Sequence, residues 1–73
     1  MSTKKEMVRQ MLSIAGGDRK IAHSVINPFK INPERAVKDL RELVPPAHLK
    51  RIVLLAASEI GDDSLLRHFP EFL

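Results

Sequence analysis

Apolar residues recur along this chain at intervals of three and four residues, which is the spacing of one face of an α-helix. The clearest case lies in residues 33–44, where charged residues separate the members of an apolar set: Ala36, Val37, Leu40, Leu43 and Val44. Such a stripe beside a charged face predicts an amphipathic helix over residues 33–44. Since no stretch alternates between apolar and polar residues as a half-buried β-strand does, we expect an all-α fold.

The same spacing predicts two helices before this one. The first should cover residues 4–15, because Thr3 opens a capping-box pattern at its start and Gly16-Gly17 stands at its end. The second should be short. Asp18 is a good N-cap residue for it, and Asn27 should end it, because the residue before a proline is disfavoured in the helical conformation.

The triplet Ile-Asn-Pro occurs twice, at residues 26–28 and 31–33. We interpret the repeat as the joint between two helices: Asn27-Pro28 would end the second helix, and Asn32-Pro33 would cap and open the third. A ligand-binding loop is the alternative, but Asn and Pro already have local structural reasons to stand here. Two apolar residues should anchor the intervening linker in the core: Phe29 and Ile31.

Residues 46–60 carry apolar side chains on almost every side of a fourth helix. A helix that is apolar nearly all round is usually buried, so we expect this one at the centre of the fold. Gly61 should end it, and a last short helix over residues 64–69, capped by Asp62 or Asp63, should precede Pro70. The prediction is a compact single-domain bundle spanning residues 1–73, with four to five short helices around a buried fourth helix.

The amino-acid composition excludes several kinds of protein and indicates where this one is found. The chain has 73 residues and no cysteine, which excludes a disulfide framework and a thiolate metal site and fits a reducing compartment. Its longest apolar run, Ile52 to Ala57, is far below the about 20 residues that span a bilayer. We therefore expect a cytoplasmic protein that has no membrane partner.

No pattern in the sequence indicates catalysis or a cofactor. The three histidines, His23, His48 and His68, fall on three different predicted helices and lack the spacing of a zinc motif. The serines stand in no nucleophile-elbow context, and the three glycines form no phosphate-binding loop. We expect no metal, no cofactor and no enzymatic activity.

Charge is distributed unevenly, and it raises the possibility of nucleic-acid binding. Residues 1–35 carry a net charge of +4 and residues 36–73 a net charge of −1. The basic half would attract nucleic acid or an acidic protein. The candidate contacts are Lys4, Lys5, Arg9, Arg19 and Lys20 in that half, and His48, Lys50 and Arg51 at the start of the fourth helix, where free N–H groups and cations together bind anions. For this last group the alternative is that the charges only keep an apolar helix soluble.

Residues 17–22 resemble the start of a helix-turn-helix unit, in which the third helix would read the major groove. Two features oppose this reading. The connection over residues 27–32 is longer than the usual turn of three to four residues. In addition, the third helix carries acidic residues among its lysines and arginines: Glu34, Asp39 and Glu42. DNA phosphates repel these carboxylates.

The C-terminal residues offer a second candidate contact surface. Five of the last nine residues are large and apolar: Leu65, Leu66, Phe69, Phe72 and Leu73. Because Pro70 prevents the last helix from continuing, we select Phe69, Phe72 and Leu73 as candidate contacts with a partner. The alternative is that these side chains complete the core of the monomer.

Together these patterns predict a small non-enzymatic regulatory or adaptor module that acts by protein–protein interaction. Its partner would be another protein, or a second copy of itself in a homodimer. The alternative function is a DNA-binding transcriptional regulator with a divergent helix-turn-helix and a basic N-terminal half. The salt dependence of association with duplex DNA would distinguish the two functions. A protein that contacts phosphates loses affinity steeply as the salt concentration rises.

Overall fold

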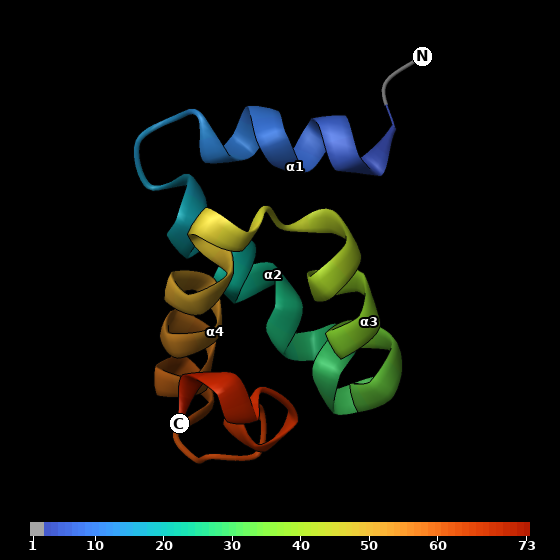
Figure 1. Cartoon of the computed structure of the whole chain (residues 1–73), viewed down its shortest axis with the longest axis vertical. Helices are drawn as coiled ribbons and strands as arrows, with labels where there is room; N and C mark the ends of the chain where they lie inside the picture. Colours follow the sequence, from blue (N-terminus) through green and yellow to red (C-terminus); the bar gives the residue numbers. More distant parts are fainter. Residues whose placement is uncertain (1–2) are drawn as a thin grey trace.

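The computed structural model describes residues 3–73 and shows an all-α fold. Four α-helices, α1 (Lys4–Leu12), α2 (Gly17–Ile31), α3 (Pro33–Leu43) and α4 (Pro46–Ile60), precede two short 3-10 segments, η1 (Leu66–His68) and η2 (Pro70–Phe72). The helices α2, α3 and α4 form the body of the molecule, α1 crosses one end of it, and the C-terminal tail folds back at the other end (Figure 1). Among residues 3–73, no helix has the length and apolar content that crossing a membrane would require.

Local capping fixes several helix ends where the sequence predicts them. The Thr3 hydroxyl accepts a hydrogen bond from the Glu6 amide at 3.2 Å, and Asn32 Oδ1 accepts one from the Arg35 amide at 3.3 Å. These bonds satisfy amides that have no partner inside the helix. Gly61 ends α4 in the left-handed conformation, with φ of 90°. The predicted bounds of the fourth helix and the predicted start of the third are confirmed.

The first helix is shorter than the predicted residues 4–15, because α1 ends at Leu12. At its C-cap, the Ser13 hydroxyl donates to the Gln10 carbonyl at 2.6 Å, and the Ser13 amide is shared between the Arg9 and Gln10 carbonyls. Serine often competes with the helix for backbone groups in this way. The residues that follow form an irregular turn instead of a last helical turn.

The second helix is longer than predicted, and both of its predicted ends are wrong. It begins at Gly17 with Gly16 as its N-cap, so Asp18 lies in the first turn. It also passes through Pro28 and ends at Ile31. A proline inside a helix costs about 3 kcal/mol. The continued helix carries the next residue, Phe29, into the core, and burying such a side chain returns about 1.5–3 kcal/mol.

The doubled triplet therefore has one structural role in place of the two predicted. Asn27-Pro28 lies inside α2, whereas Asn32-Pro33 caps and opens α3 as predicted. The joint between α2 and α3 is the single residue Asn32. Phe29 is buried as predicted, but Ile31 is 84% exposed and anchors nothing within the described residues.

The core is built by α2, α3, α4 and the tail. Its buried apolar members are Ile21, Ala22, Phe29, Ala36, Leu40, Val44, Ile52, Val53, Ala56, Leu65 and Phe69. Helix α1 contributes no buried residue and packs on this core through partly buried side chains. In place of the predicted helix over residues 64–69, the tail forms η1 and η2, with the Asp62 carboxylate accepting from the Ser64 amide at 2.9 Å.

Candidate functional site

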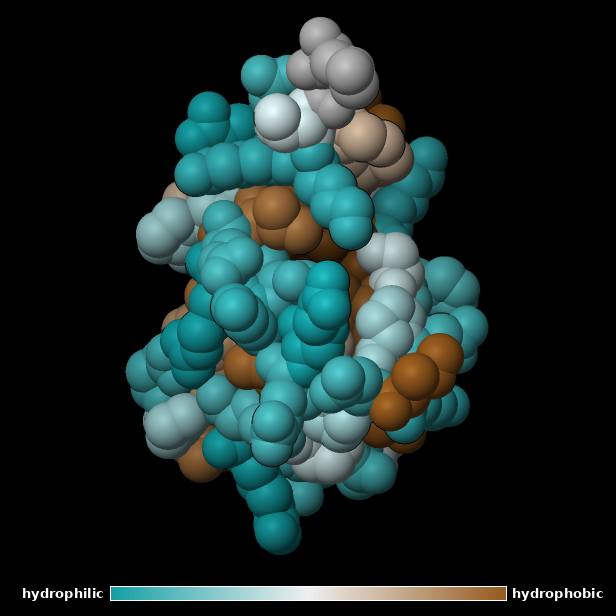
Figure 2. Space-filling model, turned by 90° about the vertical axis from the view of Figure 1, so that its right-hand side faces the viewer, coloured by the Kyte–Doolittle hydropathy of each residue, from teal (hydrophilic) through white to brown (hydrophobic). Residues whose placement is uncertain are grey.

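An apolar groove lies where α1 meets α2 and α3, and we name it the α1–α3 groove. It encloses about 140 Å³. Its lining residues are Val8 from α1, then Ile21, Ser24, Val25 and Pro28 from α2, and Ala36, Asp39, Leu40, Leu43 and Val44 from α3 or its C-cap. Figure 2 shows apolar surface at this junction, between α1 above and the polar outer face of α3 below.

Each helix places its side chains in the groove for a local reason. The floor consists of core residues such as Leu40, which lie on the apolar stripes of α2 and α3. The rim consists of partly buried residues at the edges of those stripes, such as Val25 and Leu43. Helix α1 crosses the body of the molecule and contributes one residue, Val8, to the lining.

Two polar groups are set in this apolar lining. The Ser24 hydroxyl donates to the Ile21 carbonyl at 2.7 Å and keeps its lone pairs for a further donor. The Asp39 carboxylate is partly buried and lies 3.8 Å from the guanidinium of Arg35. The groove can therefore hold an apolar group and, at its edge, a hydrogen-bond donor or a cation.

The size of the groove limits what it can bind. Sites for drug-sized molecules usually measure about 300–1,000 Å³. A volume of about 140 Å³ is below that range and is suited to one large apolar side chain. Single apolar or aromatic side chains inserted into such hollows are the usual anchors of protein–protein contacts.

A second, shallower hollow lies beside the end of α4. It is lined by Leu54, Ala57, Ser58, Gly61, Asp62, Asp63 and Leu66. Leu54 is 40% exposed here, although it lies on the helix that the sequence predicts to be apolar all round and buried. The hydrogen bonds that Asp62 accepts from Ser64 lower the pKa of its carboxyl group, so the rim of this hollow is acidic.

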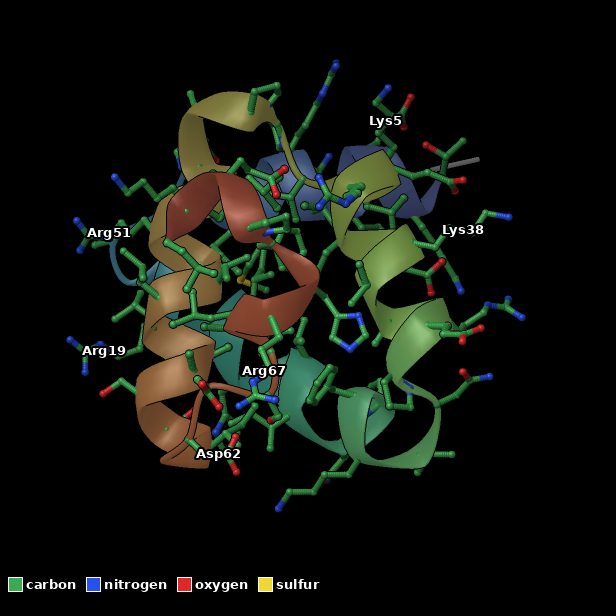
Figure 3. The ribbon with its side chains drawn as sticks, turned by 60° about the horizontal axis from the view of Figure 1, so that its bottom comes forward. Lys5, Arg19, Lys38, Arg51, Asp62 and Arg67 are labelled. Carbon is green, nitrogen blue, oxygen red and sulfur yellow. The ribbon has the colours of Figure 1, made fainter. Side chains whose placement is uncertain are left out.

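The structure divides the predicted anion contacts between different edges of the molecule. Arg19 and Arg51 point outward from one edge, whereas Lys5, on α1, lies at a different edge (Figure 3). Lys5 and Arg9 lie around a hollow near the turn between α3 and α4. Three further predicted contacts are exposed lysines without an ion pair among residues 3–73: Lys4, Lys20 and Lys50.

The starts of α2 and α4 do lie together, but a carboxylate already lies between them. Asp18 Oδ2 is 3.3 Å from His48 Nδ1 and 3.5 Å from Arg51 Nε, and only 18% of the Asp18 side chain is exposed. The sequence predicts Asp18 as a helix cap, whereas the structure places its carboxylate beside two predicted anion contacts. An external anion would have to compete with this carboxylate.

The three predicted tail contacts have different environments. Phe69 is fully buried, so it belongs to the core and its assignment to a contact surface is corrected. Phe72 is partly buried and stacks on Phe69 with ring centroids 5.7 Å apart. Leu73 is 80% exposed and is the one member of the three that a partner can reach fully.

The histidines do not come together. His23 contacts Glu59 at 3.1 Å, His48 contacts Asp18, and the ring of His68 packs edge-on against Phe29. No group of three or more metal-ligating side chains is present among residues 3–73.

The α1–α3 groove itself was not predicted from the sequence. The sequence pattern assigns Leu43 only to the apolar stripe of the third helix and Pro28 only to a helix end. The signal that was present is the excess of apolar residues at the stripe edges, which a core of this size does not cover.

A comparison with protein families, with curated proteins and with solved structures found no match for this chain.

Proposed function

We propose that this protein is a small regulatory or adaptor module that binds another protein through the α1–α3 groove. The observation that carries the proposal is the apolar lining of this groove, open at the surface and interrupted by one hydroxyl and one carboxylate. The partner would insert one large apolar side chain and place a donor or a cation beside Asp39. The groove would then serve as the anchor point of a larger contact.

Further features support a binding module in place of an enzyme. No group in the groove pairs a nucleophile with a base, since Ser24 bonds a backbone carbonyl and Asp39 lies beside an arginine. We also propose that α4 is the central scaffold, because Ile52, Val53 and Ala56 are fully buried. A cysteine-free chain suits a reducing compartment, and we propose the cytoplasm.

DNA binding ranks second as a function. In its favour, Lys4, Lys5, Arg9 and other exposed cations carry no ion pair among residues 3–73. Against it, two arginines of the predicted reading helix are engaged: Arg35 lies beside Asp39, and Arg41 binds Glu71 at 2.6 Å. The one-residue joint at Asn32 is also shorter than the turn of a helix-turn-helix unit.

Affinity capture with a matched pair of variants tests the proposal. Ser24→Leu adds a side chain to the groove lining, and Ser58→Leu makes the same change at an exposed helical serine beside the second hollow. Wild-type protein and Ser58→Leu should retain the same partner from nuclease-treated and untreated lysates, and Ser24→Leu should lose it. If only the Ser58→Leu variant lost the partner, the binding site would be the hollow beside α4 and not the groove. If the wild-type protein captured the partner from untreated lysate but not from nuclease-treated lysate, DNA binding would be favoured.

A further inference from the structure

Helix α1 is attached to the rest of the molecule less firmly than the other elements. No hydrogen bond or ion pair between side chains joins α1 to residues 17–73. It packs on the core through three partly buried residues: Val8, Met11 and Leu12. By contrast, ion pairs join α2 to α4, as in His23–Glu59, and join α3 to the tail. A helix held by partly exposed apolar contacts alone is the element that opens most readily.

The turn after α1 is what holds this helix over its own groove. Gly16 has φ of 76°, in the left-handed region, and Gly17 packs so closely that a Cβ atom there would collide with the Met11 carbonyl. Backbone atoms cannot move aside as the end of a flexible side chain can. The closed turn therefore depends on a glycine at position 17, and any side chain there must displace α1 relative to α2.

We propose that α1 is exchangeable, and that in a domain-swapped dimer the α1 of a second copy of this chain replaces the chain's own α1 as one wall of the α1–α3 groove. The inference goes beyond the proposed function, because it concerns the helix that walls the groove and leaves the groove itself open to a partner side chain. The contact is already shown to fit, because α1 lines this groove with Val8 within one chain. Exchanging an identical element between copies needs no new complementary surface.

Exposed apolar residues on α1 and in the turn supply the driving force for the second copy. Met7 on α1 is 58% exposed, and Ile14 in the turn is 49% exposed. In a swapped dimer the two opened turns run past each other at the two-fold axis, so each Ile14 would meet its counterpart. Extended residues 13–16 can span about 13–14 Å, which lets α1 reach a neighbour instead of folding back.

The test compares two glycine variants of the full chain. Gly17→Ala should strain the closed turn, release α1 and lower the dissociation constant of the dimer by about tenfold or more, as measured by sedimentation over a wide range of protein concentration. Gly61→Ala is the matched control: Gly61 also has positive φ, at 90°, with open space around its Cβ position, but it lies at the end of α4. Its dimer dissociation constant should equal that of the wild type. A Gly17→Ala protein that folds and sediments as the wild type does would overturn the proposal.

Cross-linking identifies which copy supplies α1 and keeps the test valid if Gly17→Ala folds poorly. Val8→Cys and Leu43→Cys place two thiols in the groove lining of an otherwise cysteine-free chain. A short bismaleimide should join two chains in the dimer fraction of this double variant and one chain to itself in the monomer fraction. Links within single chains in the dimer fraction would reject the exchange. If exchange fails while Ser24→Leu still loses its captured partner, the proposed function stands alone. If exchange occurs while no partner is captured, the swapped dimer stands and the proposed function fails.

Discussion

Arg41 joins α3 to the tail through several contacts made by one guanidinium group. It donates two hydrogen bonds to the Glu71 carboxylate, at 2.6 and 3.0 Å, and one to the His68 carbonyl at 2.9 Å. It also lies 4.4 Å from the centroid of the Phe69 ring, in a cation–π arrangement. A planar group with a fork of donors suits this geometry better than lysine would. The tail is therefore held by both charge and packing.

This pairing predicts a change of stability in acid. The hydrogen bonds from Arg41 lower the pKa of Glu71, so the Glu71 contribution to stability is complete above the ordinary glutamate pKa of about 4.3. It is lost as pH falls through the lowered value. Thermal midpoints measured from neutral to acid pH should show a smaller acid-dependent loss for Glu71→Gln than for the wild type. Glu34→Gln, which alters an exposed glutamate without an ion pair among residues 3–73, should keep the wild-type profile.

Burial predicts that two tail residues differ sharply in their effect on stability. Phe69 is fully buried, so Phe69→Ala should lower the free energy of unfolding by about 3–5 kcal/mol. Leu73 is 80% exposed, so Leu73→Ala should change it by less than about 0.5 kcal/mol. Urea unfolding of both variants provides the measurement. Equal losses would mean that the tail packs differently from the arrangement described here.

At the scale of elements, α2 and α3 form a tight pair because one residue connects them. Asn32 closes the last turn of α2 by donating its amide to the Pro28 carbonyl at 2.9 Å, and its side chain caps α3. The short joint keeps Pro28 and Leu43 on helices that line the same groove. It also makes the pair unlike a helix-turn-helix unit.

The cap predicts a purely structural effect of Asn32. Replacing an N-cap asparagine by alanine usually costs about 0.5–2 kcal/mol, so Asn32→Ala should lower the denaturant midpoint by a corresponding amount. Partner capture should be unchanged once the smaller folded fraction is taken into account, because Asn32 does not line the groove. If a fully folded Asn32→Ala protein lost its partner, the doubled triplet would be a binding site after all.

At the scale of the whole molecule, charge and apolar surface lie in different places. The predicted anion contacts point from different edges, and where the starts of α2 and α4 meet, the Asp18 carboxylate lies beside His48 and Arg51. The apolar openings lie instead between α1 and α3 and beside the end of α4. We therefore expect duplex DNA to contact only one of these basic edges at a time.

This separation predicts that the protein binds duplex DNA weakly and that its affinity depends only slightly on salt. A protein that uses one basic edge would neutralise only a few phosphates, so the slope of log affinity against log salt should be shallower than about −4. Fluorescence anisotropy of a labelled duplex at increasing salt measures it. A slope steeper than about −6 would show that both edges contact phosphate, and would support the DNA-binding alternative.

The sequence alone was sufficient for the features that depend on neighbouring residues. Apolar spacing predicted an all-α chain, and the local chemistry of Thr3, Asn32 and Gly61 predicted three helix ends that the structure confirms. These features follow from hydrogen bonds and backbone preferences within a few residues, which any fold of this chain would share. Net charge and the absence of cysteine are likewise properties of the sequence.

Tertiary packing decided where those local rules gave way. Pro28 should have ended α2, but burying Phe29 carried the helix on to Ile31. Asp18 should have capped that helix, but the start of α4 supplied His48 and Arg51 as partners. The α1–α3 groove also exists only because residues far apart in the chain meet at the crossing of α1. Such contacts depend on the relative placement of whole helices, and apolar spacing along one helix contains no information about that placement.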